Sequence, residues 1–225
     1  MTPVMEKVAV EKKVLSENDR VAAGLRRAFR DNGIYCVNLI SSPGAGKTSL
    51  LERTLARFRP EERVAVLTGD IATDNDAQRI ARFGFPTKQI CTGGSCHVDA
   101  RMVDRALNGW DLASLDLLLI ENVGNLVCPA SYDLGEEDKV VVLSTTEGED
   151  KPLKYPATFF RASTLVLNKI DLLPFVPFNI QAARENARKV NPNIEILEVS
   201  CTTGEGLDTW CAWLWNRAMR AANDV

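Results

Sequence analysis

Short apolar runs alternate with amphipathic stretches along most of the chain. The apolar runs are typical of strands buried on both faces, and the amphipathic stretches have helical spacing. We expect strands at residues 34–40, 63–67, 87–91, 115–120, 139–145, 164–167 and 194–199. We expect helices at residues 11–30, 49–58, 76–83, 96–107, 179–190 and 206–221, with a crossover segment at 151–161. This alternation predicts an α/β fold with a mostly parallel sheet and helices on both faces.

The pattern also suggests how the chain is organised. Residues 1–33 form an N-terminal segment whose apolar residues recur at helical spacing among charges, so we expect an amphipathic helix there. Residues 34–225 are expected to form one domain, because no linker or internal repeat interrupts them. Residues 122–138 are irregular and rich in small residues, which favours a functional loop over a plain connector.

Composition narrows the class of protein. The chain has 225 residues, of which 45% are hydrophobic and 25% charged, and this fits one large domain with a substantial core. The net charge of -3 gives no reason to expect nucleic-acid or membrane binding. No segment approaches the ~20 apolar residues of a membrane span, and the N-terminus lacks the apolar run of a signal peptide. We therefore expect a cytoplasmic protein.

The clearest chemical signal is the segment 41–48, SSPGAGKT, which lies between a predicted strand and a predicted helix. Strand, glycine-rich turn and helix are the context of a phosphate-binding loop (P-loop). Lys47 would reach the β- and γ-phosphates, and the Thr48 hydroxyl would bind Mg²⁺. Ser41 replaces the usual first glycine, and a glycine-rich turn that only caps a helix is the alternative. The expected nucleotide-binding residues here are Pro43, Gly44, Ala45, Gly46, Lys47, Thr48 and Ser49.

The segment 168–171, Asn-Lys-Ile-Asp, indicates which nucleotide binds. The Asp171 carboxylate can accept hydrogen bonds from N1–H and the exocyclic amine of guanine, whereas adenine has no N1–H. Asn168 would brace the P-loop and Lys169 would lie over the base. The alternative for Asp171 is a helix N-cap. After the last strand, Ser200, Cys201 and Thr202 would close over the guanine carbonyl through their backbone N–H groups.

Three other strand ends carry the residues expected to hold magnesium and act in hydrolysis. Glu121 follows an apolar strand, as an acidic Mg²⁺ ligand does in nucleotide hydrolases. The backbone N–H of Gly124 could sense the γ-phosphate. Asp70 and Asp74 are candidates for the magnesium shell and for positioning the attacking water, although Asp74 could equally cap a helix. No arginine finger is evident in the sequence, so we expect slow turnover.

These motifs share one placement in the predicted fold. Ser41, Asp70, Glu121, Asn168 and Ser200 all come at or next to the carboxyl end of a predicted strand. In open parallel sheets, ligands bind beyond these strand ends. The common position supports one nucleotide site more strongly than any single motif does.

A second set of residues has different chemistry. Thiolate and imidazole ligands suit nickel, zinc or copper, and Cys96 is followed directly by His97, the only histidine. Cys128 could approach this pair. Three ligands leave the metal shell open, or shared between two subunits. The alternative is that Cys128 and Cys91 are small buried hydrophobes.

Several longer stretches together resemble one known family. They are GDIATDNDAQRI, QICTGGSCHVDA, IENVGNLVCPASYDLGE, TEGEDKPLKYP and LNKIDLLP. They resemble the HypB family, the nickel-incorporation GTPases of [NiFe]-hydrogenase maturation, over about residues 37–207. SSPGAGKT also fits this family, so Ser41 agrees with the resemblance.

The resemblance implies a P-loop GTPase that dimerises on binding GTP and hydrolyses it to GDP. It implies that Cys96, His97 and Cys128 bind Ni²⁺ or Zn²⁺ at the dimer interface. It also implies a zinc-binding partner chaperone and nickel delivery to the hydrogenase large subunit. Residues 1–33 contain neither Cys nor His, so we expect no N-terminal nickel-binding cluster or histidine-rich storage tract.

Three alternatives stay open. A urease-type nickel GTPase is related, but QICTGGSCHVDA favours the hydrogenase branch. A P-loop small-molecule kinase is disfavoured by the predicted guanine selectivity. A metal-binding scaffold with a vestigial GTP site would bind metal without hydrolysing GTP.

Overall fold

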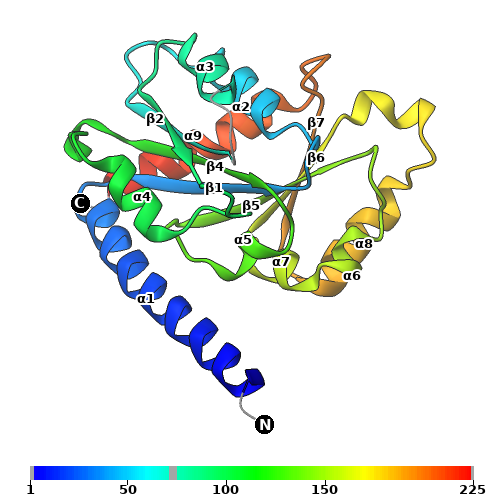
Figure 1. The fold of residues 1–225 in the computed structure, drawn as a ribbon. Coiled ribbons are helices and arrows are strands. Elements are labelled where there is room, and N and C mark those ends of the chain that lie inside the picture. Colours follow the sequence, from blue (N-terminus) through cyan, green and yellow to red (C-terminus); the bar gives the residue numbers. More distant parts are fainter. Residues whose placement is uncertain (1–2, 71–74, 224–225) are drawn as a thin grey trace.

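The computed structural model describes residues 3–70 and 75–223. Its strands are β1 (Tyr35–Ser41), β2 (Val64–Asp70), β3 (Thr87–Cys91), β4 (Leu117–Gly124), β5 (Asp138–Ser144), β6 (Thr164–Asn168) and β7 (Glu195–Val199). They pair in parallel in the order β3-β2-β4-β1-β5-β6-β7 (Figure 1). The expected α/β fold with a parallel sheet is confirmed.

The helices lie before, between and after these strands. The longer ones are α1 (Pro3–Asp31), α2 (Lys47–Leu55), α3 (Asn75–Ala81), α4 (Ala100–Leu107), α8 (Ile180–Val190) and α9 (Leu207–Asn223). The shorter ones are α5 (Cys128–Ser131), α6 (Lys151–Lys154), α7 (Pro156–Arg161) and the 3-10 helices η1 (Leu112–Ser114) and η2 (Ile170–Phe175). Within the described ranges, no helix combines the length and apolar character needed to cross a bilayer.

Helices cover both faces of the sheet, as its apolar strands require. On one face α2 and α9 pack over the centre of the sheet, and the buried Trp210 of α9 donates a hydrogen bond of 2.9 Å to Thr54 of α2. The other face is covered by α1 and α4 over one half, and by α7 and α8 over the other. Figure 1 shows that α1 then extends away from the body; near its C-terminal end Leu25 and Phe29 are buried against the core.

Two predicted boundaries are wrong in ways that affect the site. The helix expected from Cys96 begins at Ala100, because Asp99 caps it by accepting a hydrogen bond of 2.9 Å from the Met102 N–H. Cys96 and His97 therefore lie in the preceding turn. The strand expected to end before Glu121 continues to Gly124, after a register shift that pairs Ser41 with Gly124. Glu121 thus lies inside β4.

Candidate functional site

A cavity of about 500 Å³ lies at the carboxyl edge of the sheet, where the P-loop connects β1 to α2. Gly46 precedes α2 with φ 98°, a left-handed conformation that glycine adopts readily. A Cβ atom there would come within 2.5 Å of the Asn168 side chain. The lining residues include Pro43, Gly44, Gly46, Lys47, Thr48, Ser49, Gly69, Asp70, Asp76, Arg79, Glu121, Asn122, Val123, Gly124 and Lys169.

Lys47 is buried at the base of this cavity. Its Nζ donates a hydrogen bond of 2.8 Å to the hydroxyl of Ser41, the residue that replaces the usual first glycine. Burial lowers the pKa of Lys47, while the nearby carboxylates of Glu121 and Asp76 raise it. The ammonium group is thus desolvated and placed to gain from an anionic ligand.

Glu121 faces the P-loop from β4. Its Oε1 accepts a hydrogen bond of 2.7 Å from the Thr48 hydroxyl, and its Oε2 is buried without a hydrogen-bond partner among the described residues. Burial raises the pKa of Glu121 to about 7, although the charge of Lys47 lowers it. A buried carboxylate oxygen beside a threonine hydroxyl is a donor set that fits Mg²⁺.

Of the two aspartates expected to act after the second strand, the structure describes only Asp70. Asp70 is the last residue of β2 and lines the cavity, and β2 pairs directly with β4 so that Thr68 is opposite Glu121. Asp70 thus lies at the cavity, and its part in a magnesium shell stays a prediction. Asp74 lies outside the described residues, and its role stays a prediction.

Sequence reasoning missed two residues that line the cavity, Asp76 and Arg79 of α3. Arg79 pairs with Glu52 of α2 at 2.6 Å and with Asp76 at 3.3 Å. The signal was present in the sequence, because an acid and an arginine three residues apart share one face of a helix. This spacing alone does not show whether the two residues form an ion pair on the surface or at the nucleotide site.

Asn168 and Lys169 connect the end of β6 to the P-loop. Asn168 Nδ2 donates a hydrogen bond of 2.9 Å to the Ala45 carbonyl, and Lys169 Nζ donates one of 2.9 Å to the Gly44 carbonyl. Lys169 is held at φ 65°, an uncommon conformation for a residue other than glycine. Asn168 thus lies where a brace for the loop was expected.

Asp171 lies in η2 and does not cap a helix through its side chain. It accepts a hydrogen bond of 2.5 Å from the hydroxyl of Ser200, which directly follows β7. The Ser200 hydroxyl in turn accepts from the Thr202 N–H at 3.2 Å, and the Cys201 carbonyl accepts from Arg53 Nε at 2.7 Å. The segment after β7 is therefore attached to the carboxylate that was expected to select guanine.

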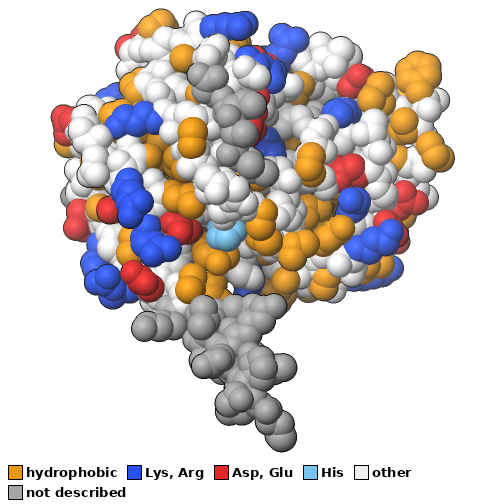
Figure 2. All heavy atoms as spheres, viewed as in Figure 1, with side chains coloured by type: hydrophobic (Ala, Val, Ile, Leu, Met, Phe, Trp, Pro, Cys, Tyr) orange, Lys and Arg blue, Asp and Glu red, His pale blue; other side chains and the backbone are white. Residues whose placement is uncertain are grey.

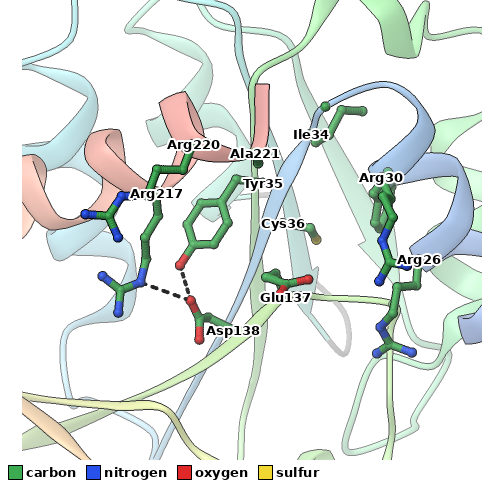
Figure 3. A pocket seen from close by; sticks show the side chains of 13 residues that line it. Arg26, Arg30, Ile34, Tyr35, Cys36, Glu137, Asp138, Arg217, Arg220 and Ala221 are labelled. Atoms are coloured by element: carbon green, nitrogen blue, oxygen red, sulfur yellow. Dashed lines mark hydrogen bonds and ion pairs between the residues drawn. The ribbon is translucent and has the colours of Figure 1, made fainter. Parts of the chain in front are cut away.

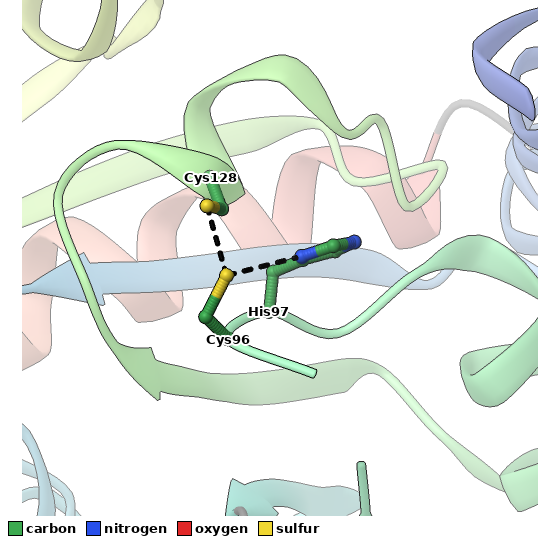
Figure 4. Close-up of side chains that lie close together, drawn as sticks. All are labelled: Cys96, His97 and Cys128. Carbon is green, nitrogen blue, oxygen red and sulfur yellow. Dashed lines mark hydrogen bonds between the residues drawn. The ribbon is translucent and has the colours of Figure 1, made fainter. Parts of the chain in front are cut away.

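The sulfur atoms of Cys96 and Cys128 approach to 2.8 Å, although they come from the turn before α4 and from the start of α5 (Figure 4). The Cys96 sulfur is 3.8 Å from His97 Nδ1, and the ligand atoms of all three residues lie within 4.8 Å of one another. No fourth His, Cys, Asp or Glu of the described ranges belongs to this group. The cluster offers three ligands, which is too few for a closed tetrahedral shell.

The surroundings of the cluster favour ligation over packing. The His97 ring stacks on Tyr132 with centroids 3.7 Å apart, and burial lowers the pKa of His97, which favours the neutral imidazole that binds metals. Cys96 and Cys128 are only partly buried. Cys91 is exposed, so the alternative that it is a buried hydrophobe is wrong. Figure 2 shows hydrophobic side chains around His97; Val127, next to Cys128, is 60% exposed.

Asn122 connects the nucleotide cavity to the metal-ligand cluster. It lines the cavity from β4, and its buried Oδ1 accepts hydrogen bonds of 3.0 Å from the N–H groups of Val98 and Val123. Val98 directly follows His97. Three residues further along the chain, Asn125 Nδ2 donates to the Cys96 carbonyl at 3.2 Å. Movement at the end of β4 would therefore reach both segments that carry the ligands.

A second cavity of about 420 Å³ lies at the opposite edge of the sheet, between the C-terminal ends of α1 and α9 (Figure 3). Two of its lining residues interact with the Asp138 carboxylate: Arg217 contacts it at 3.3 Å, and Tyr35 donates a hydrogen bond to it. Arg26 pairs with Asp133 at 2.6 Å. These contacts attach α9 to β5 and α1 to the segment that precedes β5.

Comparisons with known proteins agree with this geometry. The profile of the CobW/HypB/UreG nucleotide-binding domain matches residues 36–198. Hydrogenase maturation factor HypB of Azotobacter vinelandii is 52% identical over 205 residues, covering 91% of this chain and 68% of that protein. HypB from Archaeoglobus fulgidus superposes with a TM-score of 0.84 and 39% identity, covering 90% of this chain and 99% of that one. HypB from Helicobacter pylori, solved in complex with nickel, gives a TM-score of 0.86 and 36% identity, covering 91% and 96%.

Proposed function

The chain belongs to the HypB family of hydrogenase maturation factors, within the CobW/HypB/UreG group of nucleotide-binding proteins, and we propose that it is a GTP-hydrolysing nickel metallochaperone. In this proposal, GTP binding at the P-loop controls a metal site made by Cys96, His97 and Cys128. The observation that carries it is Asn122, which lines the nucleotide cavity and accepts a hydrogen bond from the residue after His97.

GTP is proposed as the substrate because Asp171 and the Ser200 segment lie together near the P-loop brace. Asp171 would accept from the N1–H and the amine of guanine. Lys47 would contact the β- and γ-phosphates, and Thr48, Asp70 and Glu121 would hold Mg²⁺. Bound there, Mg²⁺ would neutralise phosphate charge during hydrolysis. Hydrolysis to GDP would remove the γ-phosphate contacts made at the end of β4.

Nickel is proposed as the cargo, and the metal site as a dimer interface. The three ligands leave the shell incomplete, and the exposed Val127 beside Cys128 would be buried by a partner subunit. The Helicobacter pylori relative was solved with nickel, which supports the metal's identity, although thiolate and imidazole ligands also accept Zn²⁺. A zinc-binding chaperone would supply the nickel, and the hydrogenase large subunit would receive it, directly or indirectly.

Hydrolysis assays test the nucleotide part of the proposal. We expect the wild type to hydrolyse GTP in preference to ATP, and Lys47→Ala to abolish hydrolysis. Asp171→Asn should shift preference from GTP to xanthosine triphosphate by about 100-fold or more, because xanthine has a carbonyl where guanine has its amine. The exposed Asp104→Asn on α4 is the matched control. Equal hydrolysis of ATP, or phosphate transfer to an acceptor other than water, would contradict the GTPase assignment.

A further inference from the structure

Arg79 of α3 lines the same cavity as the P-loop. Its Nε and Nη2 atoms donate hydrogen bonds of 3.1 and 2.6 Å to the two carboxylate oxygens of Glu52, and Nη1 contacts Asp76 at 3.3 Å. Glu52 lies on α2, one helical turn after Thr48. The guanidinium is therefore oriented both by its own helix and by the helix that begins at the P-loop.

These contacts leave part of the guanidinium available to a ligand. A guanidinium has five N–H donors, of which the three hydrogen bonds to Glu52 and Asp76 use three. The two that remain are on Nη1 and Nη2. A planar group with a remaining donor on each terminal nitrogen can contact phosphate oxygens in a fixed orientation, which a lysine ammonium cannot.

The charge of Arg79 also acts on the other polar groups of the cavity. The side-chain hydrogen bond that Arg79 donates to Glu52 raises the pKa of Arg79, and the charges of Asp76 and Glu121 raise it further, so the guanidinium stays charged. Arg79 in turn is one of the groups that lower the pKa of Glu121. Lys47 and Arg79 therefore present two positive charges to whatever anion enters the cavity.

We propose that Arg79 is a catalytic residue for GTP hydrolysis, contacting the terminal phosphate from within the same chain. This inference rests on the proposed function. In the reaction, a water oxygen bonds to the γ-phosphorus as the bond from that phosphorus to the bridging oxygen breaks. The electron pair of the broken bond stays on GDP, and the proton of the water passes to the phosphate released. Arg79 stabilises the negative charge that develops on the phosphoryl and bridging oxygens.

Glu52 and Asp76 act as positioning residues in this arrangement. The bidentate pair with Glu52 fixes the plane of the guanidinium, and the contact with Asp76 holds it against its own helix. A purely structural ion pair between α2 and α3 would make the same contacts. The two roles differ in what they do to turnover, because a structural pair affects folding and nucleotide affinity without acting on the chemical step.

Single-site variants separate these roles when kcat, KM, GDP affinity and thermal stability are measured with Mg²⁺ and GTP. We expect Arg79→Ala to lower kcat by about 100-fold or more, with GDP affinity within about twofold of the wild type. Arg79→Lys, which keeps the charge but not the planar group, should be intermediate. Millimolar guanidinium ion should restore part of the lost kcat in Arg79→Ala. Arg82→Ala, an exposed residue just after α3 that does not line the cavity, is the control.

A folded Arg79→Ala protein with wild-type kcat would overturn the inference, as would lost activity that follows lost GDP affinity and is not restored by guanidinium. Glu52→Gln should lower kcat by a smaller factor, and the double variant should be no slower than Arg79→Ala alone; multiplicative losses would contradict the positioning role. If wild-type hydrolysis is abolished by Lys47→Ala but unaffected by Arg79→Ala, only this inference fails and the proposed function stands.

Discussion

At the residue scale, Glu121 shows how one side chain is prepared for a metal ion. Its carboxylate is buried in β4, with one oxygen bound to Thr48 and the other without a partner among the described residues. Burial raises its pKa to about 7 from the ordinary value of 4.5. Bound Mg²⁺ would favour the ionised form, so the cost of burying this carboxylate is offset by metal binding.

Because burial raises the pKa of Glu121, the stability of the folded protein depends on pH. In metal-free and nucleotide-free protein, the folded state keeps the Glu121 proton to higher pH than the unfolded state does. The contribution of Glu121 to the free energy of unfolding is therefore fully present below pH 4.5 and is lost as the pH rises through about 7. The difference between the pKa values of Glu121 in the folded and unfolded states corresponds to a loss of at most about 3 kcal/mol in the free energy of unfolding.

Glu121→Gln, which keeps the shape of the protonated carboxyl, should therefore raise the free energy of unfolding at pH 8 by up to about 3 kcal/mol. Most of this gain should disappear at pH 5. Urea unfolding in the presence of EDTA and without nucleotide measures both values. The exposed Glu185→Gln on α8 is the control, with no change expected at either pH. A gain that is the same at pH 5 and pH 8 would contradict the burial argument.

At the scale of elements, the junction of β4 with the P-loop sets the shape of the phosphate site. The register shift in β4 places Gly124 opposite Ser41 at the end of β1. A Cβ atom on Gly124 would lie 3.1 Å from Pro43 Cα and 3.2 Å from Pro43 N. A side chain at this position would therefore require the loop to move by a few tenths of an ångström.

Gly124→Ala should accordingly displace the P-loop by a few tenths of an ångström and lower the rate of GTP hydrolysis about tenfold. The same change at Gly24 of α1, where a new Cβ would lie 4.0 Å from the Arg27 side chain, is the matched control. Gly24→Ala should leave hydrolysis unchanged and stabilise the helix by up to about 1 kcal/mol. Wild-type hydrolysis in Gly124→Ala would show that the loop accommodates the methyl group without effect.

At the scale of the whole molecule, β4 links two sites of different chemistry. Glu121 and Asn122 of β4 face the nucleotide cavity, and α5 with Cys128 follows a few residues later. Buried hydrogen bonds also join Asn122 to Asn38 at 3.1 Å and to Val98 at 3.0 Å. A change at the γ-phosphate would thus be transmitted through a buried polar network, which has few alternative arrangements.

Nickel should therefore bind more tightly when a non-hydrolysable GTP analogue replaces GDP, by a factor of about 5 to 150. By linkage, nickel must tighten binding of the analogue or dimerisation by the same factor. Titrations at fixed nucleotide state, with the oligomeric state followed, measure it. Cys96→Ala and Cys128→Ala should lose nickel binding, whereas Cys91→Ala, an exposed cysteine outside the cluster, should not. Equal affinities in both states would end the coupling hypothesis.

Asn122→Ala tests the route of this coupling. Removing the side chain deletes the hydrogen bonds to Val98 and Asn38 while leaving all three metal ligands in place. We expect nickel binding in the GDP state to persist and the ratio between the two nucleotide states to fall toward one. A ratio that stays at the wild-type value would leave the coupling intact but exclude Asn122 as its route.

The sequence alone determined the alternation of strands and helices, the P-loop and the predicted guanine motif, because each depends on residues close together in the chain. Apolar periodicity indicated the strands. The contiguous motif SSPGAGKT indicated phosphate binding without any knowledge of which distant residues contact it. Only the tertiary structure decided that Cys96 meets Cys128, 32 residues away, that Asn122 joins the two sites, and that Arg79 lines the cavity. These contacts depend on the order of strands in the sheet and on side-chain packing between elements, neither of which local periodicity specifies.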